Sequence, residues 1–502
     1  MPDPIYYFMQ LPVIPKFIKL PACILIITGI VFCKRVQNED QWNTAFPAIG
    51  TQSSPRCTDL NQDGILDIII GAGMNEYFPS DHGVIALDGK NGSTLWSVPA
   101  SDQMVGSPTF LDITNDGIHD IIIGGRSHNL LAINGKSGEV LWRYQVIKDN
   151  GIKELARFNF FNCQITRDVN NDGLRDILTA CGGNAKASPH SMQGRYPGTL
   201  MIIDSKSGEI ISIDTMPDGL ENYMSPVLIN ERGIEYILYG TGGETFGGNF
   251  YKVKFVDLLQ SDLSGSKLII HNPAQGFIAP PTLVDVNNDL VNEIILSAHN
   301  GVVYCIDGLS DSILWKKEMN LEANNMLSPG YFNEDSILDF FGYFAKGAWP
   351  ENNGIIQFAL DGQHGDELFR DSIGSIGFSS PISFQADHDK ETEVLIHINF
   401  GRPNTLSYAL NKSQLILFDF PEGKKVYLDT LQSFKNISTT PWLGDLDGDS
   451  NLDLITCYLK NTYKIDEVGG MYISKLKTAY LNSPTSAWSE YMGKNGSCVI
   501  SK

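Results

Sequence analysis

The sequence repeats one pattern along almost its whole length: a Ser-Pro pair, an Asp-rich loop and an apolar run. Ser54-Pro55 leads to the loop 59–67 and then to Ile68-Ile69-Ile70-Gly71. Ser107-Pro108 leads to the loop 112–120 and to a second Ile-Ile-Ile-Gly run. Five further copies and one degenerate copy near Ser225-Pro226 follow at spacings of about 48 to 62 residues, a period typical of propellers, solenoids and arrays.

Each copy divides into four short strands. Proline suits the opening of a strand because it has no ladder donor to give, and a continuous Ile run is typical of a strand buried on both faces. A second repeated turn joins the third and fourth strands, at 87–96, 133–142 and 306–315, with Gly, Asn and Asp to supply positive φ angles. Four strands per repeat predict an all-β, eight-bladed β-propeller. Its blades should begin near residues 53, 106, 161, 223, 278, 327, 379 and 439.

The two ends of the repeat array predict how the ring closes. Trp42 precedes Ser54 by 12 residues, much as Trp96 precedes Ser107 by 11, so 41–46 looks like a fourth strand with no first three. The eighth copy has a third strand at 471–476 and no Trp-containing turn after it. We therefore expect the N-terminal strand to complete the last blade. The predicted domains are one propeller over 41–493, a linker at 34–40 and a tail at 494–502.

The first 33 residues have the pattern of a targeting segment. Lys16 and Lys19 precede 13 apolar residues, 20–32. That stretch is shorter than the roughly 20 residues of a bilayer span and fits a signal-peptide core. Cys33 follows directly and resembles a bacterial lipoprotein processing site, which makes it the candidate lipidated residue. The alternative is an uncleaved signal anchor, and both predict an extracytoplasmic propeller attached to a membrane through its N-terminus.

The net charge bears on the kind of partner, and the cysteine pattern bears on whether disulfides stabilise the fold. The net charge of −21 argues against nucleic acid, whose phosphates would be repelled. The eight cysteines include no C-x-x-C pair and no adjacent pair. They are interpreted as buried free thiols or as one or two disulfides.

The Asp-rich loops have the spacing of calcium ligands, with side-chain oxygens at the first, third, fifth and ninth positions. Ca²⁺ takes six to eight such oxygens, and flanking strands rather than helices exclude an EF-hand. Without a cation, three or four acids in nine residues would repel one another, so we expect bound ions that stiffen the blades. The predicted ligands are Asp59, Asn61, Asp63, Asp67, Asp112, Thr114, Asp116, Asp120, Asp168, Asn170, Asp172, Asp176, Asp285, Asn287, Asp289, Glu293, Asp445, Asp447, Asp449 and Asp453.

Three eroded copies of the loop leave their interpretation open. The loop of Asp285, Asn287, Asp289 and Glu293 keeps its ligands but has Leu290 in place of Gly. The other two, Asn333/Asp335/Asp339 and Gln385/Asp387/Asp389/Glu393, lack the first acid. They are equally well interpreted as solvated turns or as weakened calcium sites.

Taken with its apolar strand, the Asp loop is similar to the FG-GAP and VCBS-type repeats of integrin α-chain propellers. The Leu-Asp-Gly-x-x-Gly-x-x-Leu-Trp turn resembles the repeat of pyrroloquinoline-quinone (PQQ) propellers, among them the lipoprotein of the outer-membrane assembly machinery. The resemblance covers nearly all residues after about 40. It implies a propeller of the bacterial envelope.

The PQQ likeness also implies an enzymatic alternative. Quinoprotein dehydrogenases of that kind hold PQQ above a Trp floor, with a catalytic Asp beside Ca²⁺ and often a vicinal disulfide. Here the Trp residues recur at a fixed offset, which favours a repeated packing role, and no vicinal Cys pair exists. No H-E-x-x-H or G-x-S-x-G motif is present either. No catalytic residue is predicted.

Four long inserts indicate a binding face instead. They lie at 182–198, 240–249, 343–354 and 400–407, all between the second and third strands of a blade, so they should cluster at one end of the ring. Long loops on a rigid scaffold concentrate function, although plain surface inserts are the alternative. Arg195, Tyr196, Trp349 and Arg402 are the candidate contacts for a protein, peptide or glycan. The sequence thus predicts a calcium-stabilised, extracytoplasmic adhesion or assembly propeller, with a PQQ oxidoreductase second and a structural scaffold third.

Overall fold

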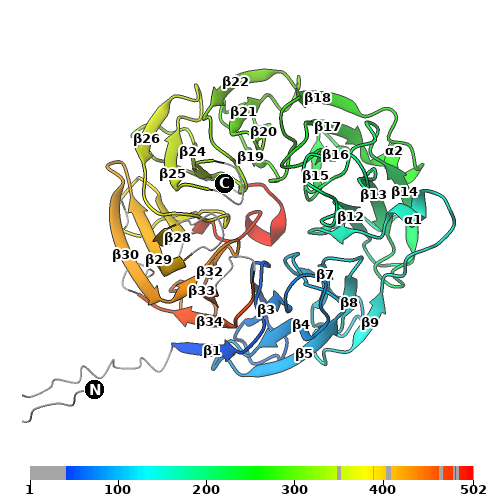
Figure 1. The fold of residues 1–502 in the computed structure, drawn as a ribbon, viewed down its shortest axis with the longest axis horizontal. Helices are drawn as coiled ribbons and strands as arrows, with labels where there is room; N and C mark the ends of the chain where they lie inside the picture. The colour runs from blue at the N-terminus through cyan, green and yellow to red at the C-terminus, as the bar shows by residue number, and fades with distance from the viewer. Residues whose placement is uncertain are drawn as a thin grey trace, which may run out of the picture. The chain divides into compact units, whose positions relative to one another are not determined.

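Eight antiparallel sheets, each built on sequential strands, stand side by side in a ring (Figure 1). The computed structural model describes residues 41–500 except 348–351, 388, 403–408, 463–466, 479–480 and 482–485. The architecture is the eight-bladed all-β propeller that the repeats predict. Within the described residues, no helix has both the length and the apolarity needed to cross a membrane.

The first four blades follow one another along the chain. Blade 1 holds β2 (Arg56–Thr58), β3 (Asp67–Gly71), β4 (Ser80–Leu87) and β5 (Thr94–Ala100). Blade 2 holds β6 (Thr109–Leu111), β7 (Asp120–Gly124), β8 (Leu130–Ile133) and β9 (Val140–Arg143). Blade 3 holds β10 (Asn159–Phe160), β11 (Gln164–Ile165), β12 (Ile177–Gly182), β13 (Thr199–Ile203) and β14 (Ile210–Thr215), with α1 (Ile152–Leu155) before it. Blade 4 holds β15 (Val227–Glu231), β16 (Ile234–Gly240), β17 (Gly248–Lys254) and β18 (Lys267–Asn272), with α2 (Phe255–Leu259) between its last two strands.

The last four blades continue the ring. Blade 5 holds β19 (Thr282–Val284), β20 (Glu293–Ser297), β21 (Val302–Ile306) and β22 (Ile313–Glu318). Blade 6 holds β23 (Ser328–Gly330), β24 (Asp339–Ala345), β25 (Ile355–Leu360) and β26 (Glu367–Asp371). Blade 7 holds β27 (Ile382–Phe384), β28 (Glu393–Arg402), β29 (Ala409–Asp419) and β30 (Lys424–Gln432), with β35 (Ser486–Trp488) beside β27. Blade 8 holds β31 (Phe434–Lys435), β32 (Trp442–Gly444), β33 (Asp453–Lys460), β34 (Met471–Leu476) and β1 (Trp42–Phe46).

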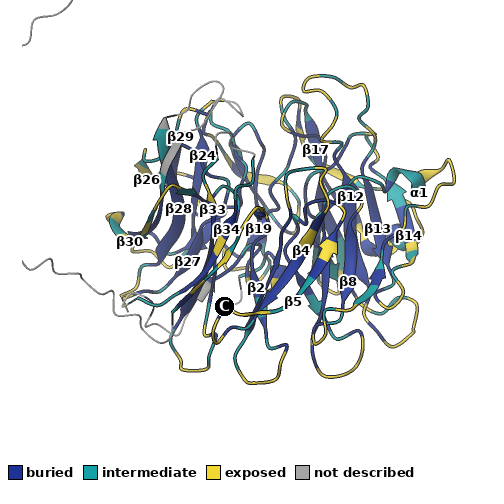
Figure 2. Ribbon diagram, turned by 60° about the horizontal axis from the view of Figure 1, so that its bottom comes forward, coloured by how far each residue is buried: buried dark blue, intermediate teal, exposed yellow. Residues whose placement is uncertain are grey.

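The apolar runs form the second strand of each blade and are buried between neighbouring blades. All five residues of β3 and of β7 are buried. Ile68 and Ile70 of blade 1 pack in one cluster with Trp442 and Ile455 of blade 8. Figure 2 shows these inner strands as buried and the connecting loops as the exposed part. The core is therefore a series of layers between the blades, which explains why the Ile runs show no polar alternation.

The N-terminal strand lies where the repeat pattern predicted it. β1 pairs antiparallel with β34, with Trp42 opposite Lys475 and Phe46 opposite Met471. Trp42 Nε1 donates a 2.9 Å hydrogen bond to the carbonyl oxygen of Gly89 in blade 1. The first described strand thus joins the last blade and contacts the first.

The repeated Trp docks one blade on the next at the junctions where it occurs. Trp96 of blade 1 donates from Nε1 to the carbonyl oxygen of Gly135 in blade 2, at 2.7 Å. Gly138 in the same turn has φ +73°, and a Cβ there would lie 2.7 Å from Trp96 Cγ. Glycine is therefore required both by the backbone and by the indole ring. The same Nε1 bond joins Trp142 to Ser205 and Trp315 to Gly362.

The Ser-Pro pairs form hydrogen bonds from blade to blade around the axis. Ser54 N donates to Ser107 Oγ, and Ser107 N donates to Asn162 Oδ1. Thr440 N of blade 8 donates to Ser54 Oγ of blade 1 at 3.0 Å, which links the two ends of the ring. The serine hydroxyl thus accepts a hydrogen bond from the neighbouring blade, and the proline keeps the backbone of the preceding serine extended.

The C-terminal segment lies near the centre of the ring (Figure 1). Trp488, Met492 and Cys498 belong to the hydrophobic cluster of blades 4 and 5. Val499 pairs with Leu283 of blade 5. Arg56 of blade 1 lies 3.7 Å from the Glu490 carboxylate, with both side chains buried. The tail therefore contacts blades on both sides of the ring.

Candidate functional site

The antiparallel blades give the propeller two chemically different faces. Connections between first and second strands, and between third and fourth strands, lie on one face, which we call the Asp-loop face. Connections between second and third strands, and those between blades, lie on the opposite face. The acidic loops and the long inserts are thus separated by the length of a strand.

On the Asp-loop face, the carboxylates accept hydrogen bonds from the amides of their own loops. Asp59 Oδ1 accepts from Gln62 N at 2.7 Å, and Asp59 Oδ2 accepts from Gly64 N at 3.1 Å. Asp63 Oδ1 accepts from Ile65 N at 2.9 Å. Asp168 accepts in the same way from Asn171 N and Gly173 N, whereas Asp112 accepts from Asp116 N and Gly117 N. The third- and fifth-position side chains in these loops, Asn61, Asp63, Thr114, Asp116, Asn170 and Asp172, are exposed.

The ninth-position acid is buried and connects two turns of its blade. Asp67 Oδ2 accepts from Leu60 N at 2.9 Å, and Asp67 Oδ1 accepts from Gly89 N at 3.0 Å. Asp120 and Asp339 make the same pair of bonds in blades 2 and 6. Burial raises the pKa of Asp67 to about 6, partly offset by the two amide bonds. Asp176, also fully buried, accepts from Val169 N, and burial raises its pKa.

The loop of blade 5 gathers an acid that its own pattern does not contain. Asp289 and Glu293 come together with Asp307, which lies in the turn between the third and fourth strands, and one ligand atom of each lies within 4.8 Å of the others. Glu293 Oε2 accepts from Val286 N, and Asn287 Nδ2 donates to Glu293 Oε1 at 3.0 Å. Asp285 is buried and accepts from the amide of Asp289.

In blade 8, two lysines occupy the acidic loop. Lys477 Nζ lies 3.1 Å from Asp447, 2.9 Å from Asp449 and 3.7 Å from Asp453. Lys475 Nζ lies 3.1 Å from Asp447 and 3.5 Å from Asp453. Asp445, Asp447 and Asp449 still lie together as a group of potential ligands. The ammonium groups supply the positive charge that the sequence pattern assigned to an ion.

A third group of potential metal ligands lies in blade 7, where Asp387, Asp389 and Glu393 meet Asp419. The residues of these loops fit a hard divalent cation by chemistry, because they offer carboxylate oxygens at close range. The sequence pattern identified the loops but missed Asp307, Asp419 and the two lysines. The repeated Asp of the turn between third and fourth strands was the available signal.

On the opposite face, a cavity of about 570 Å³ opens at the propeller axis. We call it the axial funnel. Residues from all around the ring line it, and Tyr491 of the C-terminal segment is among them. Most of its polar side chains are amides and hydroxyls, interspersed with aromatic rings. They include Thr51, Gln52, Ser54, Gln103, Asn159, Phe161, Asn162, Asn184, Tyr223, Thr245, Asn324 and Phe378.

The two arginines of the funnel are each paired with an acid. Arg126 of the β7–β8 connection lies 2.6 Å from Glu76 of the β3–β4 connection. Arg195 forms an ion pair with Glu221 and lies over the Phe246 ring. Burial raises the pKa of Glu221, and the Arg195 guanidinium partly offsets that effect. Glu244 and Glu467 also line the funnel and form no ion pair with the described residues, so its surface is polar and carries two further acids.

The four residues predicted to contact a partner do not lie at one common site in the described structure. Arg195 lines the funnel. Tyr196 is exposed and stacks on Phe158, with ring centroids 5.6 Å apart. Trp349 and the side chain of Arg402 lie outside the described residues, as does Cys33. The funnel residue Arg126 comes from a short connection, and Glu76 comes from a connection outside the four predicted inserts.

The described tryptophans do not form a quinone-binding floor. Trp42, Trp96, Trp142 and Trp315 dock between blades, Trp442 lies in β32, and Trp488 is buried at the tail. Within the described part of the chain, no Trp lines the funnel. The residues present thus do not fit PQQ as the resemblance implied. The described cysteines are free thiols: Cys57, Cys163, Cys181, Cys305, Cys457 and Cys498.

Fold and site together define an eight-bladed β-propeller with a polar axial funnel on one face and acidic loops on the other. The model of the FAM234A/B β-propeller family matches residues 42–341, and the chain belongs to this family. Mouse Protein FAM234B is 25% identical over 327 residues, which are 58% of this chain and 48% of the mouse protein. The chain therefore spans about half the length of the curated relative it matches.

Among solved structures, two quinohemoprotein alcohol dehydrogenases share the fold. The Pseudomonas putida HK5 enzyme has a TM-score of 0.54 and 10% identity, over 88% of this chain and 76% of that one. The Comamonas testosteroni enzyme has a TM-score of 0.51 and 10% identity, over 89% and 76%. At such identity the likeness shows the propeller fold alone. These matches support a PQQ-type propeller shape and give no support to a bacterial envelope origin.

Proposed function

We propose that this FAM234-family propeller is a non-enzymatic binding module whose ligand enters the axial funnel. The carrying observation is the 570 Å³ cavity, lined by side chains from all around the ring. Ligand sites in proteins are concave, with polar groups placed on a rigid frame. Here the frame is held by the Ser-Pro hydrogen bonds and the Trp contacts between blades.

The lining favours a neutral, hydroxyl-rich ligand such as an oligosaccharide. Asn162, Asn324 and Gln52 offer amide groups, and Tyr223 and Phe161 offer aromatic surface. Because Arg126 and Arg195 are already paired with Glu76 and Glu221, an anionic ligand would have to break an existing ion pair. A peptide is the alternative class of ligand for the funnel.

A glycan array probed with the labelled full-length chain tests the proposal. Asn324 and Gln52 line the cavity, so Asn324→Ala and Gln52→Ala should each weaken binding of a retained oligosaccharide at least threefold. Gln260→Ala is the matched control, since that exposed amide follows α2 on the Asp-loop face. An array without any retained glycan, or equal loss in the control, would contradict oligosaccharide binding in the funnel.

Two finer parts of the function are supported by sequence alone. We propose that the apolar segment 20–32 attaches the propeller to a membrane from the extracytoplasmic side, in an adhesion or assembly role. We also propose that Ca²⁺ binds the complete Asp loops and stiffens the blades, as their ligand spacing favours. Chelation by EDTA should then lower the melting temperature of the full chain, and added Ca²⁺ should restore it.

A PQQ-dependent oxidoreductase remains the second candidate, and a structural scaffold the third. The PQQ-like turn of the sequence favours the enzyme, whereas the absence of a Trp among the described funnel residues opposes it. Incubation with PQQ and Ca²⁺, followed by desalting and an absorbance spectrum, distinguishes the enzyme from the binding module. Retained quinone near one per chain would support the enzyme and overturn the binding reading.

A further inference from the structure

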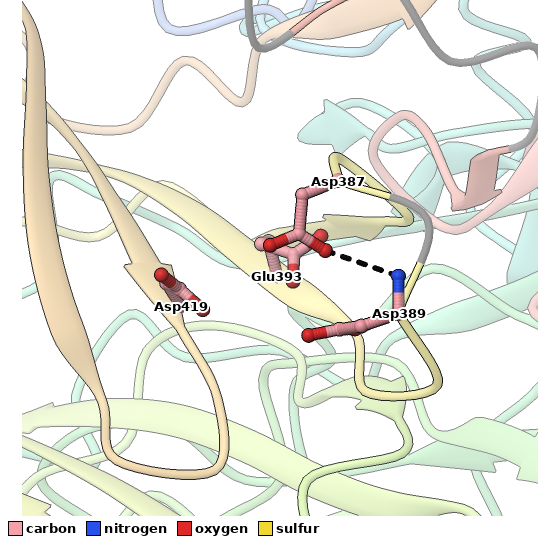
Figure 3. Close-up of side chains that lie close together, drawn as sticks. All are labelled: Asp387, Asp389, Glu393 and Asp419. Carbon is pink, nitrogen blue, oxygen red and sulfur yellow. Dashed lines mark hydrogen bonds between the residues drawn. The ribbon is translucent and has the colours of Figure 1, made fainter.

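Four carboxylates from two separate segments converge in blade 7 (Figure 3). Asp387 and Asp389 lie in the loop between β27 and β28, and Glu393 is the first residue of β28. Asp419 is the last residue of β29, on the far side of Glu393 in Figure 3. The group therefore combines an eroded Asp loop with an acid that lies 26 residues beyond Glu393 in the sequence.

The spacing of these oxygens matches the coordination sphere of Ca²⁺. One ligand atom from each of the four residues lies within 4.8 Å of the others. Ca²⁺–oxygen distances of about 2.3–2.6 Å place ligands on opposite sides of the ion about 4.6–5.2 Å apart. Asp387 and Asp389 are exposed, so water can complete the coordination sphere.

Glu393 supplies independent evidence that a ligand is missing from this group. The residue is only 1% exposed, its Oε2 accepts from Ala386 N, and its Oε1 has no hydrogen-bond donor among the described residues. In blade 1, both oxygens of the equivalent Asp67 accept amide bonds. Burying an acceptor without a partner is costly, so an oxygen in this position indicates an absent cation or donor.

A second buried oxygen of the same loop also lacks a hydrogen-bond donor in the described part of the chain. Gln385 occupies the first loop position, where the complete loops have Asp, and its Nε2 donates to the carbonyl oxygen of Asp389 at 2.7 Å. Its Oε1 is buried and has no donor among the described residues. An amide oxygen is an ordinary calcium ligand.

The charge balance distinguishes this group from blade 8. None of the ion pairs of the described residues reaches Asp387, Asp389, Glu393 or Asp419, whereas Lys475 and Lys477 enter the loop of blade 8. Four carboxylates this close together repel one another. A divalent cation would remove that repulsion.

We propose that Asp387, Asp389, Glu393 and Asp419 form a Ca²⁺ site that ties the Asp loop of blade 7 to the end of its third strand. Asp419 takes the place of the first-position acid that this loop lacks. The site is independent of the ligand in the funnel and of whether the complete loops bind ions.

Calcium stoichiometry of the full-length chain tests the site. The chelator-treated protein is titrated with CaCl₂ in an equilibrium dialysis experiment, and bound Ca²⁺ per chain is counted for the wild type and variants. Glu393→Gln retains an acceptor for Ala386 N but removes the charge. Asp419→Asn removes the charge of the half-buried Asp419 and keeps a side chain of the same shape. Each variant should bind one ion fewer than the wild type, or bind that ion at least tenfold more weakly.

Asp361→Asn is the matched control. Asp361 follows β25 of blade 6 at the position that Asp419 holds in blade 7, and it belongs to none of the described groups of potential metal ligands. It should leave the stoichiometry unchanged, and near-UV circular dichroism should show that all variants are folded. Unchanged stoichiometry in both Glu393→Gln and Asp419→Asn, or a wild type that binds no Ca²⁺, would overturn the site. A failure to find a ligand for the funnel would not contradict the calcium site in blade 7.

Discussion

Single side chains at the blade junctions carry two contributions that can be separated. Trp315 is buried against the turn of blade 6 and donates a 3.0 Å hydrogen bond from Nε1 to the Gly362 carbonyl. Trp315→Phe retains an aromatic ring and removes the donor, so we expect a loss of about 1–2 kcal/mol in the free energy of unfolding. Trp315→Ala should lose about 3–5 kcal/mol. Urea denaturation measures both.

Leu314→Ala is the control for that series. Leu314 lies on the same strand and is 47% exposed, so its truncation should change the free energy of unfolding by less than about 0.5 kcal/mol. If Trp315→Phe cost no more than Leu314→Ala, the Nε1 bond would have no part in docking the blades.

Two buried histidines should make the propeller sensitive to acid. Burial lowers the pKa of His299 to about 4 and the pKa of His397 to about 3. In the unfolded chain both titrate near 6.5. Below that pH the unfolded chain therefore binds protons that the folded chain does not, and stability falls as pH drops from about 6.5 toward 4. Each histidine contributes up to about 1.4 kcal/mol per pH unit.

His397→Gln tests this pH dependence. His397 Nε2 shares a 2.6 Å hydrogen bond with Thr456 Oγ1, which an amide can replace without titrating. The difference in free energy of unfolding between pH 7 and pH 5 should shrink in this variant. His364→Gln is the control, because the His364 side chain is 64% exposed. The same pH difference in His397→Gln as in the wild type would contradict the assignment.

At the scale of the strand, ring closure depends on β1. Ala45 lies opposite Tyr472 in β34, and its side chain is exposed, so a substitution acts on the backbone. Ala45→Pro removes an amide donor and restricts the strand. We expect a loss of about 1–3 kcal/mol and faster hydrogen exchange for the amides of Met471–Leu476. Ala45→Val, which suits a strand, should leave both unchanged, and slow exchange in Ala45→Pro would show that β1 does not hold β34.

The acidic loop of blade 8 should depend on Lys477 when divalent cations are absent. Lys477→Met retains the aliphatic stem and exposes Asp447 and Asp449 to mutual repulsion. In EDTA the free energy of unfolding should fall by about 1 kcal/mol. Lys460→Met, at an exposed strand end in the same blade, is the control. Equal stability of Lys477→Met and the wild type in EDTA would mean that the ammonium is dispensable.

The sequence predicted the elements because their chemistry is local. Ile runs, Ser-Pro pairs and Gly turns each act within a few residues, so the repeat revealed the blades and the β1 closure. Asp419 and Lys477 reach their loops through strand pairing across a blade, and nothing local to Asp387 or Asp447 announces them. The funnel is harder still, because Gln52, Asn162 and Asn324 meet only when the ring closes. The calcium and partner assignments remain predictions.

At the scale of the whole molecule, the tail joins blades that do not touch one another. Gln164 of blade 3 donates to the Gly496 carbonyl, and Leu443 N of blade 8 donates to the Ser489 carbonyl. Leu283 N of blade 5 donates to the Cys498 carbonyl. Residues 489–500 therefore act as a common brace at the axis, beneath the funnel that Tyr491 helps to line.

Arg56 is the polar anchor of this brace. It donates to the carbonyl oxygens of Pro108 and Tyr491 and faces Glu490. Burial raises the pKa of Glu490, and Arg56 partly offsets that effect. Arg56→Met leaves the carboxylate buried without its cation, so we expect a loss of about 3–5 kcal/mol in the free energy of unfolding. The tail should also loosen, and the fully buried Cys498 thiol should react faster with a thiol reagent.

The double variant Arg56→Met/Glu490→Gln separates the charge from the packing. Removing both partners eliminates the unpaired buried charge, so the double variant should be more stable than Arg56→Met alone by more than about 1 kcal/mol. Reactivity of Cys457, buried inside blade 8, is the internal control and should stay slow in every variant. If the double variant were no more stable than the single one, Arg56 would act by filling the channel, and the ion pair would add nothing to the brace.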